Sequence, residues 1–152
     1  MSKNNSGQTL FEVVVGLAVV GIVLIALASL SVQSVGNTNF SVSKSQATRL
    51  TQEGSEWIRN QRDLDWDNLA NRVNVGGQST YCLNNLSWNS GACNSSEKVS
   101  GTEFYRQVTL RGFDNDGSPG LDTVSVGVVT YWVDSVGRRE ARTTTLLSNW
   151  KN

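Results

Sequence analysis

Three aspartates lie close together in the last third of the chain and could hold a cation. Residues 114–122 read DNDGSPGLD, so Asp114, Asp116 and Asp122 bring three carboxylates into one glycine-containing turn. Ca²⁺ takes about six to eight oxygen ligands of this kind. The bidentate glutamate that closes an EF-hand loop is absent, and hairpin turns select the same residue types. We therefore keep two interpretations, a calcium site and an ordinary turn, and we expect no other cofactor.

One residue type that many enzyme mechanisms need is missing. The sequence contains no histidine, which excludes Ser-His-Asp and Cys-His catalysis together with histidine-based metal triads. No Walker loop and no glycine-rich dinucleotide turn follows a strand pattern. The 13 basic and 13 acidic residues cancel, so net charge does not draw the chain to nucleic acid. We predict that the protein is not an enzyme and has no direct nucleic-acid partner.

The two cysteines, Cys82 and Cys93, flank a polar loop that reads LNNLSWNSGA. Disulfides close loops of this kind in exported domains, and a loop of about ten residues corresponds to roughly 2–3 kcal/mol in the chain-entropy estimate. Two cysteines without histidine do not make a zinc site. We expect the pair to be bonded; the alternative is two reduced thiols that pack separately.

One carboxylate, Glu12, lies near the start of an apolar run of membrane length, residues 10–32. The uncharged stretch 13–30 spans about 27 Å as a helix, which is close to the hydrocarbon thickness of a bilayer. A carboxylate inside such a segment costs about 2.5–3.5 kcal/mol on insertion scales, and less near one end. Glu12 therefore either lies at the headgroup level of a simple anchor or has a partner in the membrane.

The residues around Glu12 form a specific pattern, Gly7-Gln8-Thr9-Leu10-Phe11-Glu12-Val13. A short polar leader ends in Gly7, and the glutamate takes the fifth place after it on an apolar helix. This pattern resembles the class III signal of type IV pilins and type II secretion pseudopilins. The resemblance implies cleavage between Gly7 and Gln8 by a prepilin peptidase and N-methylation of Gln8. It also implies an assembly platform and other pilin-like subunits as partners.

The spacing of Gln8 and Glu12 has a physical reason. After a cut behind Gly7, the new amine of Gln8 lies about one helical turn from Glu12 on the same face. In a bundle of related helices, the amine of one chain can neutralise Glu12 of its neighbour. The family most often has Phe or Met in place of Gln8, and a terminal glutamine can cyclise to an uncharged pyroglutamyl ring. We predict that the amine of Gln8 stays open. The sole proline, Pro119, lies outside the apolar segment, which favours a minor subunit over a major pilin.

A Sec-type signal peptide is the rival interpretation of the same residues. Lys3 would then belong to its basic region, and residues 26–28, Ala-Leu-Ala, would be its cleavage pattern. The length of the apolar run and the early Glu12 argue against it. Because Lys3 precedes the segment and the next basic residue is Lys44, the charge bias leaves the N-terminus in the cytoplasm. We expect a single-pass cytoplasmic membrane protein with an outer C-terminal domain, which later enters a cell-surface or periplasmic filament.

An amphipathic helix is predicted beyond the membrane segment. Apolar or small residues recur three or four positions apart from residue 47 to residue 58, at Ala47, Leu50, Gly54, Trp57 and Ile58. This spacing predicts that one long helix continues with its inner face on a sheet. The aspartates of residues 62–69 oppose the helix dipole and end it. Residues 53–69 resemble the segment after the long helix of some minor pilins, and we interpret Trp57 and Trp66 as core residues.

Strand patterns dominate the C-terminal third. Residues 103–111 alternate, residues 123–133 form the strongest strand pattern, and a turn at 134–137 leads into 139–147. One face of the first of these strands carries apolar side chains, at Phe104, Val108 and Leu110. The pattern predicts an antiparallel sheet. The end of the chain also resembles the C-terminal hairpin of pilin-modification (V-type) and pseudopilin I-type minor subunits.

The combined prediction is an α+β, pilin-like fold in which a long N-terminal helix packs on an antiparallel β-sheet. We divide the chain into a leader (1–7), a transmembrane and filament-core helix (8–32), an amphipathic continuation with connector (33–71) and an exported globular domain (72–152). The predicted function is a minor pilin-like structural subunit of a type IV pilus or related filament. A type II secretion pseudopilin is the alternative within this class. A Sec-secreted or membrane-anchored β-domain that acts as a binding module is the alternative outside it.

Overall fold

A computed structural model describes residues 6–74, 76–114 and 121–149. The chain divides into two units, Met1–Val42 and Ser43–Asn152, and one helix, α1 (Ser6–Leu64), contributes to both. The structure thus follows the predicted long helix through the polar segment 31–46 without a break. The finer division of the chain at residues 32 and 71 stays a prediction.

The first unit consists of helix over the residues that the structure describes. Its aliphatic side chains favour an α-helix only weakly where they are β-branched, but each backbone group inside the helix is hydrogen-bonded within the helix itself. The hydroxyls of Ser29 and Ser31 donate to the carbonyl oxygens of Ile25 and Leu27, at 3.0 Å each. These two polar side chains therefore need no partner from solvent.

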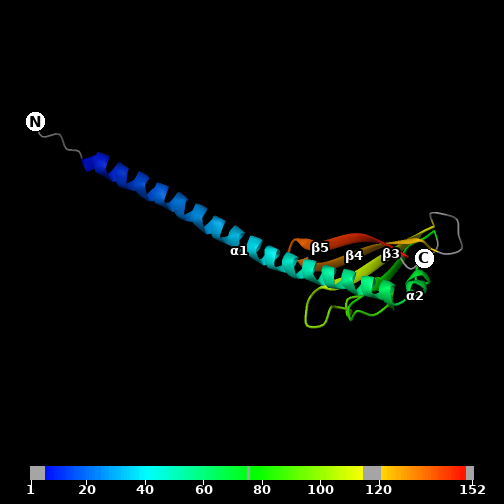
Figure 1. Cartoon of the computed structure of the whole chain (residues 1–152). Helices are drawn as coiled ribbons and strands as arrows, with labels where there is room; N and C mark the ends of the chain where they lie inside the picture. Colours follow the sequence, from blue (N-terminus) through cyan, green and yellow to red (C-terminus); the bar gives the residue numbers. More distant parts are fainter. Residues whose placement is uncertain (1–5, 75, 115–120, 150–152) are drawn as a thin grey trace, which may run out of the picture. The chain divides into compact units, whose positions relative to one another are not determined.

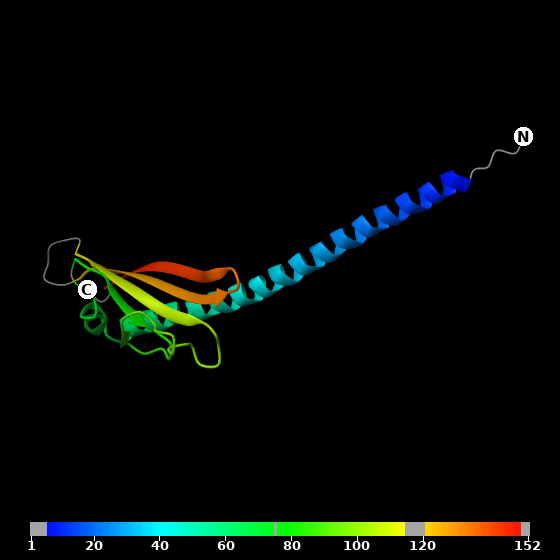
Figure 2. The same ribbon diagram turned by 180° about the vertical axis from the view of Figure 1, so that it is seen from behind.

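The second unit is a helix on a sheet (Figure 1). Its strands are β1 (Ser79–Cys82), β2 (Asn89–Ser90), β3 (Tyr105–Phe113), β4 (Thr123–Asp134) and β5 (Gly137–Ser148). They form one antiparallel sheet in the order β2-β1-β3-β4-β5. The C-terminal part of α1 lies along one face of this sheet, and Figure 2 shows the strands from the other side. The predicted fold class is confirmed, and β1 and β2 extend the sheet beyond the three strands that the sequence patterns indicated.

The core of the second unit lies between α1 and the sheet. Ala47, Leu50 and Ile58 of α1 are buried as predicted, and Trp57 is half-buried against the same cluster. From β4, alternate residues point into this core: Val124, Val126, Val128, Thr130 and Trp132. Trp66 is also buried, so the interpretation of the two tryptophans as core residues is confirmed.

The aspartates after α1 do more than end it. α1 stops at Leu64, and a second short helix, α2 (Trp66–Ala70), begins at once. Asp65 is its N-cap, because the extended backbone at Asp65 lets the side-chain Oδ1 accept from the backbone N–H of Asn68 at 3.1 Å. Asp67 lies in the first turn of α2, where the helix dipole favours a negative charge. The predicted helix end is confirmed, with capping of α2 as its additional cause.

Candidate functional site

The N-terminal part of α1 leaves its apolar side chains uncovered. From Leu10 to Leu30 the large hydrophobic residues are between 44% and 70% exposed. By length and composition this helix is able to cross a membrane, and no part of its most apolar window is buried in the described structure. A buried core helix passes the same length test, but it would not leave these side chains open. An apolar surface of this extent marks a membrane or protein contact.

Glu12 lies on this uncovered surface. The backbone of Gly7 and Gln8 is in the first turn of α1, and Glu12 follows in the next turn with an exposed side chain. Four helical positions correspond to a rise of about 6 Å, so Gln8 and Glu12 lie on one face. No basic residue occurs between Glu12 and Lys44.

The disulfide predicted between Cys82 and Cys93 is present. It joins the end of β1 to the loop after β2, and the two Cα atoms are 4.8 Å apart. Inside this ring, Leu86 has a positive φ of 51°, which non-glycine residues seldom adopt. The bond fixes the loop against the sheet, where Cys82 itself is buried.

The predicted calcium loop lies largely outside the described residues, and this includes Asp116. Asp114 and Asp122 are described and border that gap. Within the described parts of the chain, no group of three His, Cys, Asp or Glu side chains is arranged to hold a metal ion. The calcium site stays a prediction.

One buried cation was missed by sequence reasoning. Arg106 lies on the core face of β3 between the predicted core residues Phe104 and Val108, and only 2% of its surface is exposed. Its Nη1 donates to Glu53 Oε2 at 2.7 Å and to the carbonyl oxygen of Leu50 at 3.1 Å, while Nε donates to the carbonyl oxygen of Leu83 at 3.1 Å. Arg106 therefore ties α1 to the sheet and to the disulfide-closed loop. A charged residue at an inward position of an alternating strand was the available signal.

Gly54 makes room for this arginine. A Cβ at Gly54 would lie 3.0 Å from Cδ of Arg106 and 3.1 Å from Cγ1 of Val128. Both distances are shorter than ordinary van der Waals contact, so the absence of a side chain lets α1 approach the sheet closely. Two adjacent residues thus accommodate Arg106. Glu53 accepts a hydrogen bond from its guanidinium, and Gly54 leaves space for its side chain.

The outer face of the sheet carries a ladder of stacked aromatic rings and cations. The rings of Tyr105 and Tyr131 stack with centroids 5.0 Å apart, Arg138 lies 3.8 Å over Tyr131, and Lys98 lies 5.8 Å from Tyr105. Burial raises the pKa of Tyr131, and the Arg138 guanidinium lowers it in part. With these ring faces already in contact with neighbours, the ladder stabilises the sheet and offers no open stacking platform.

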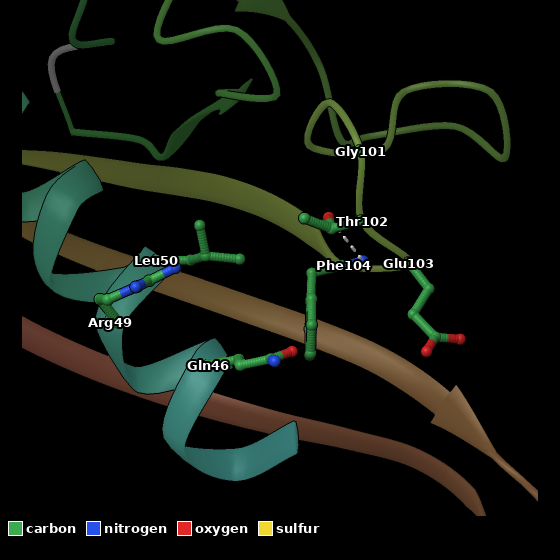
Figure 3. A pocket seen from close by; sticks show the side chains of 7 residues that line it. All are labelled: Gln46, Arg49, Leu50, Gly101, Thr102, Glu103 and Phe104. Carbon is green, nitrogen blue, oxygen red and sulfur yellow. Dashed lines mark hydrogen bonds between the residues drawn. The ribbon is translucent and has the colours of Figure 1, made fainter. Parts of the chain in front are cut away.

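A surface depression of about 500 Å³ lies between α1 and the segment before β3 (Figure 3). Leu50 and Phe104 form its apolar part, and Gln46 points toward Phe104. The charged side chains of Arg49 and Glu103 point away from each other, so they form no acid–base pair. Thr102 is engaged locally, because its Oγ1 donates to the carbonyl oxygen of Val99 and accepts from the backbone N–H of Phe104. This arrangement offers no catalytic geometry.

Comparison with known proteins identifies the N-terminal segment. Residues 2–28 match the family model described as the prokaryotic N-terminal methylation motif. No curated protein and no solved structure gave a match. The matched residues contain Gly7, Gln8 and Glu12, and they open the helix that continues onto the sheet. The chain thus carries the N-terminal methylation motif at the start of a long helix whose C-terminal part packs on an antiparallel sheet.

Proposed function

We propose that the protein is a minor pilin-like structural subunit of a type IV pilus or related filament. In this proposal a prepilin peptidase cleaves the chain between Gly7 and Gln8, and the amine of Gln8 is methylated. The helix then waits in the cytoplasmic membrane with the C-terminal domain outside. An assembly platform extracts the helix from the membrane into a filament. There the apolar helices of neighbouring subunits surround it in place of lipid.

The observation that carries this proposal is Glu12 at the start of an apolar helix that nothing in the described chain covers. A carboxylate without a cationic partner is costly to place in the lipid interior of a membrane. Beside a neighbouring helix, the amine of that chain's Gln8 can pair with Glu12. This ion pair, which exists only in the assembly, offsets the cost of placing the carboxylate in the membrane. The same contact sets the axial register, because both groups occupy defined turns.

The finer assignment to a minor subunit is supported by two features of the sequence. The apolar segment lacks the proline of many major pilins, and the C-terminal hairpin is similar to that of V-type and I-type minor subunits. A type II secretion pseudopilin would use the same helix and the same Glu12 pairing. The location of the assembled filament, at the cell surface or confined to the periplasm, distinguishes the two.

Processing is tested by the intact mass of the chain purified from its native membrane. We expect a mature chain that begins at Gln8 with a methylated amine. A chain that begins at Met1, or one cut after Ala28, would contradict the proposal. A chain found only as pyroglutamate would overturn the pairing of Gln8 with Glu12.

Assembly is tested with Glu12→Ala and a matched control, Glu56→Ala. We expect Glu12→Ala to lower the amount of this chain in sheared filaments by about tenfold or more, which corresponds to about 1.4 kcal/mol. Its amount in the membrane and the melting temperature of the domain should not change, because Glu12 belongs to the first unit and is not among the core residues of the second. Glu56 forms only an exposed ion pair with Arg59, at 2.7 Å, so its removal should leave assembly intact.

A further inference from the structure

The sheet of the second unit has two edges of very different length. β2 ends the sheet on one side with only Asn89 and Ser90. On the other side β5 pairs with β4 from Gly137 to Ser148, and no strand lies beyond it among the residues that the structure describes. A long edge strand presents a row of backbone N–H and C=O groups to any extended chain that approaches.

Two hydrogen bonds show which groups of β5 face this open edge. The backbone N–H of Asn149, next to β5, donates to the carbonyl oxygen of Asp122 at 3.2 Å, so odd-numbered residues face β4. The carbonyl oxygen of Glu140 accepts from Nζ of Lys44, which belongs to α1 and not to the sheet. Since the direction alternates along an antiparallel strand, the even-numbered residues 142, 144, 146 and 148 face outward.

The start of β5 is covered by α1, whereas its second half is open. Nζ of Lys44 donates to the outward carbonyl oxygen of Glu140 at 2.6 Å. The bond from Oγ1 of Thr51 reaches Ala141, whose backbone groups face β4. Within the described structure, the outward backbone groups of Thr144 and Leu146 have no such cover. Both side chains are exposed, and Leu146 is 67% exposed.

Residues 143–148 also lack the features that usually block an edge. Their sequence, TTTLLS, contains no charge, proline or glycine, and the register with β4 continues without a bulge. The charged residues of β5 lie before this segment, where Arg142 and Arg138 share the carboxylate of Glu140 at 3.1 Å and 3.8 Å. Recognition at this edge would therefore be by main-chain hydrogen bonds to an uncharged extended segment.

We propose that the edge formed by residues 143–148 of β5 pairs with an extended, uncharged segment of a neighbouring pilin-like subunit; the identity of that partner rests on the function proposed above. The segment is not a second β5. Two β5 strands related by a two-fold axis would pair antiparallel and reverse one domain against the other. The helices of a filament insert in one direction, so that arrangement does not fit the assembly.

The test places a photoreactive amino acid at Ser148 of the full-length chain and compares Thr144→Pro with Thr144→Val in assembled filaments. Proline removes the outward N–H and leaves the ladder with β4 intact, whereas valine keeps the N–H and the strand preference. We expect cross-links to a neighbouring subunit, per incorporated chain, to fall about tenfold with Thr144→Pro and to persist with Thr144→Val. Should Thr144→Pro not fold, Leu146→Lys keeps the backbone donor and should reduce the cross-links by charge.

The outcomes separate the two proposals. Absence of the unmodified chain from filaments would contradict the proposed function. Incorporation with no cross-link at Ser148, or with cross-links that neither variant lowers, would overturn the pairing of β5 alone. Mass spectrometry of the cross-linked peptide decides the occupant, and a second β5 or an exported cargo protein in its place would likewise overturn the proposal.

Discussion

The two parts of α1 use the same aliphatic residue types but bury them in different ways. In the second unit, Ala47 and Ile58 have no exposed surface because the sheet covers them. In the first unit, Leu24 and Ile25 are 61% and 70% exposed. Burial of a Leu or Ile side chain contributes about 1.5–3 kcal/mol to folding stability. The exposed side chains of the first unit do not make this contribution within the described chain. One part of the helix thus stabilises the domain, whereas the other leaves its apolar side chains exposed, as the proposed membrane and filament contacts require.

Truncation of one aliphatic side chain in each part should separate these roles most clearly. Ile58→Ala should lower the free energy of unfolding of the domain by about 2–5 kcal/mol, because it leaves a cavity in a closed core. Leu24→Ala should leave that free energy within about 0.5 kcal/mol. Denaturant unfolding of the full chain in detergent, followed by the tryptophan fluorescence of the second unit, measures both. Equal losses of unfolding free energy in the two variants would contradict the different roles of the two parts of α1.

A matched pair of glycines sharpens the comparison. Gly54→Ala should destabilise the domain by about 1–3 kcal/mol, because the new methyl group meets Arg106 and Val128 at close range. A Cβ at Gly21 of the first unit meets no atom within 4 Å, so Gly21→Ala should leave the domain unchanged. Melting temperatures of both variants test this expectation, and a stabilised Gly54→Ala would show that the helix does not need its close approach to Arg106.

The smallest expected effect is on the folding stability of the second unit at low pH. Asp134, in the β4–β5 turn, accepts hydrogen bonds from the backbone N–H groups of Val136 and Gly137, at 2.8 and 2.9 Å. The bond from Val136 is the main cause that lowers the pKa of Asp134 below its ordinary value of 3.8; those from Gly137 and Arg139 add to it, while desolvation opposes it.

Because the folded-state pKa of Asp134 is depressed, its stabilising contribution is present above pH 3.8 and is lost as the pH falls through the lower folded value. Asp134→Asn should therefore be less stable than the parent chain near pH 7, and the difference should shrink at pH 3. Urea midpoints at the two pH values measure it. A difference that grows on acidification would refute this role.

Sequence patterns predicted the elements whose residues repeat regularly. The long helix, the inward residues Ala47, Leu50 and Ile58, and strands β3, β4 and β5 follow from periodicity, because burial on one face selects apolar residues at a fixed spacing. β1 and β2 lie in the loop region and were not predicted. They are short, and their pairing depends on the distant β3 and on the disulfide.

The sequence by itself determined the N-terminal segment. Gly7, Gln8 and Glu12 are spaced along one helix, and a helix converts spacing directly into geometry, so no distant residue is needed to place them. Only the tertiary structure decided the seating of Arg106 on Glu53 and Leu50 and the open edge of β5. Those contacts join residues that are far apart in the chain, and their existence depends on which strand pairs with which.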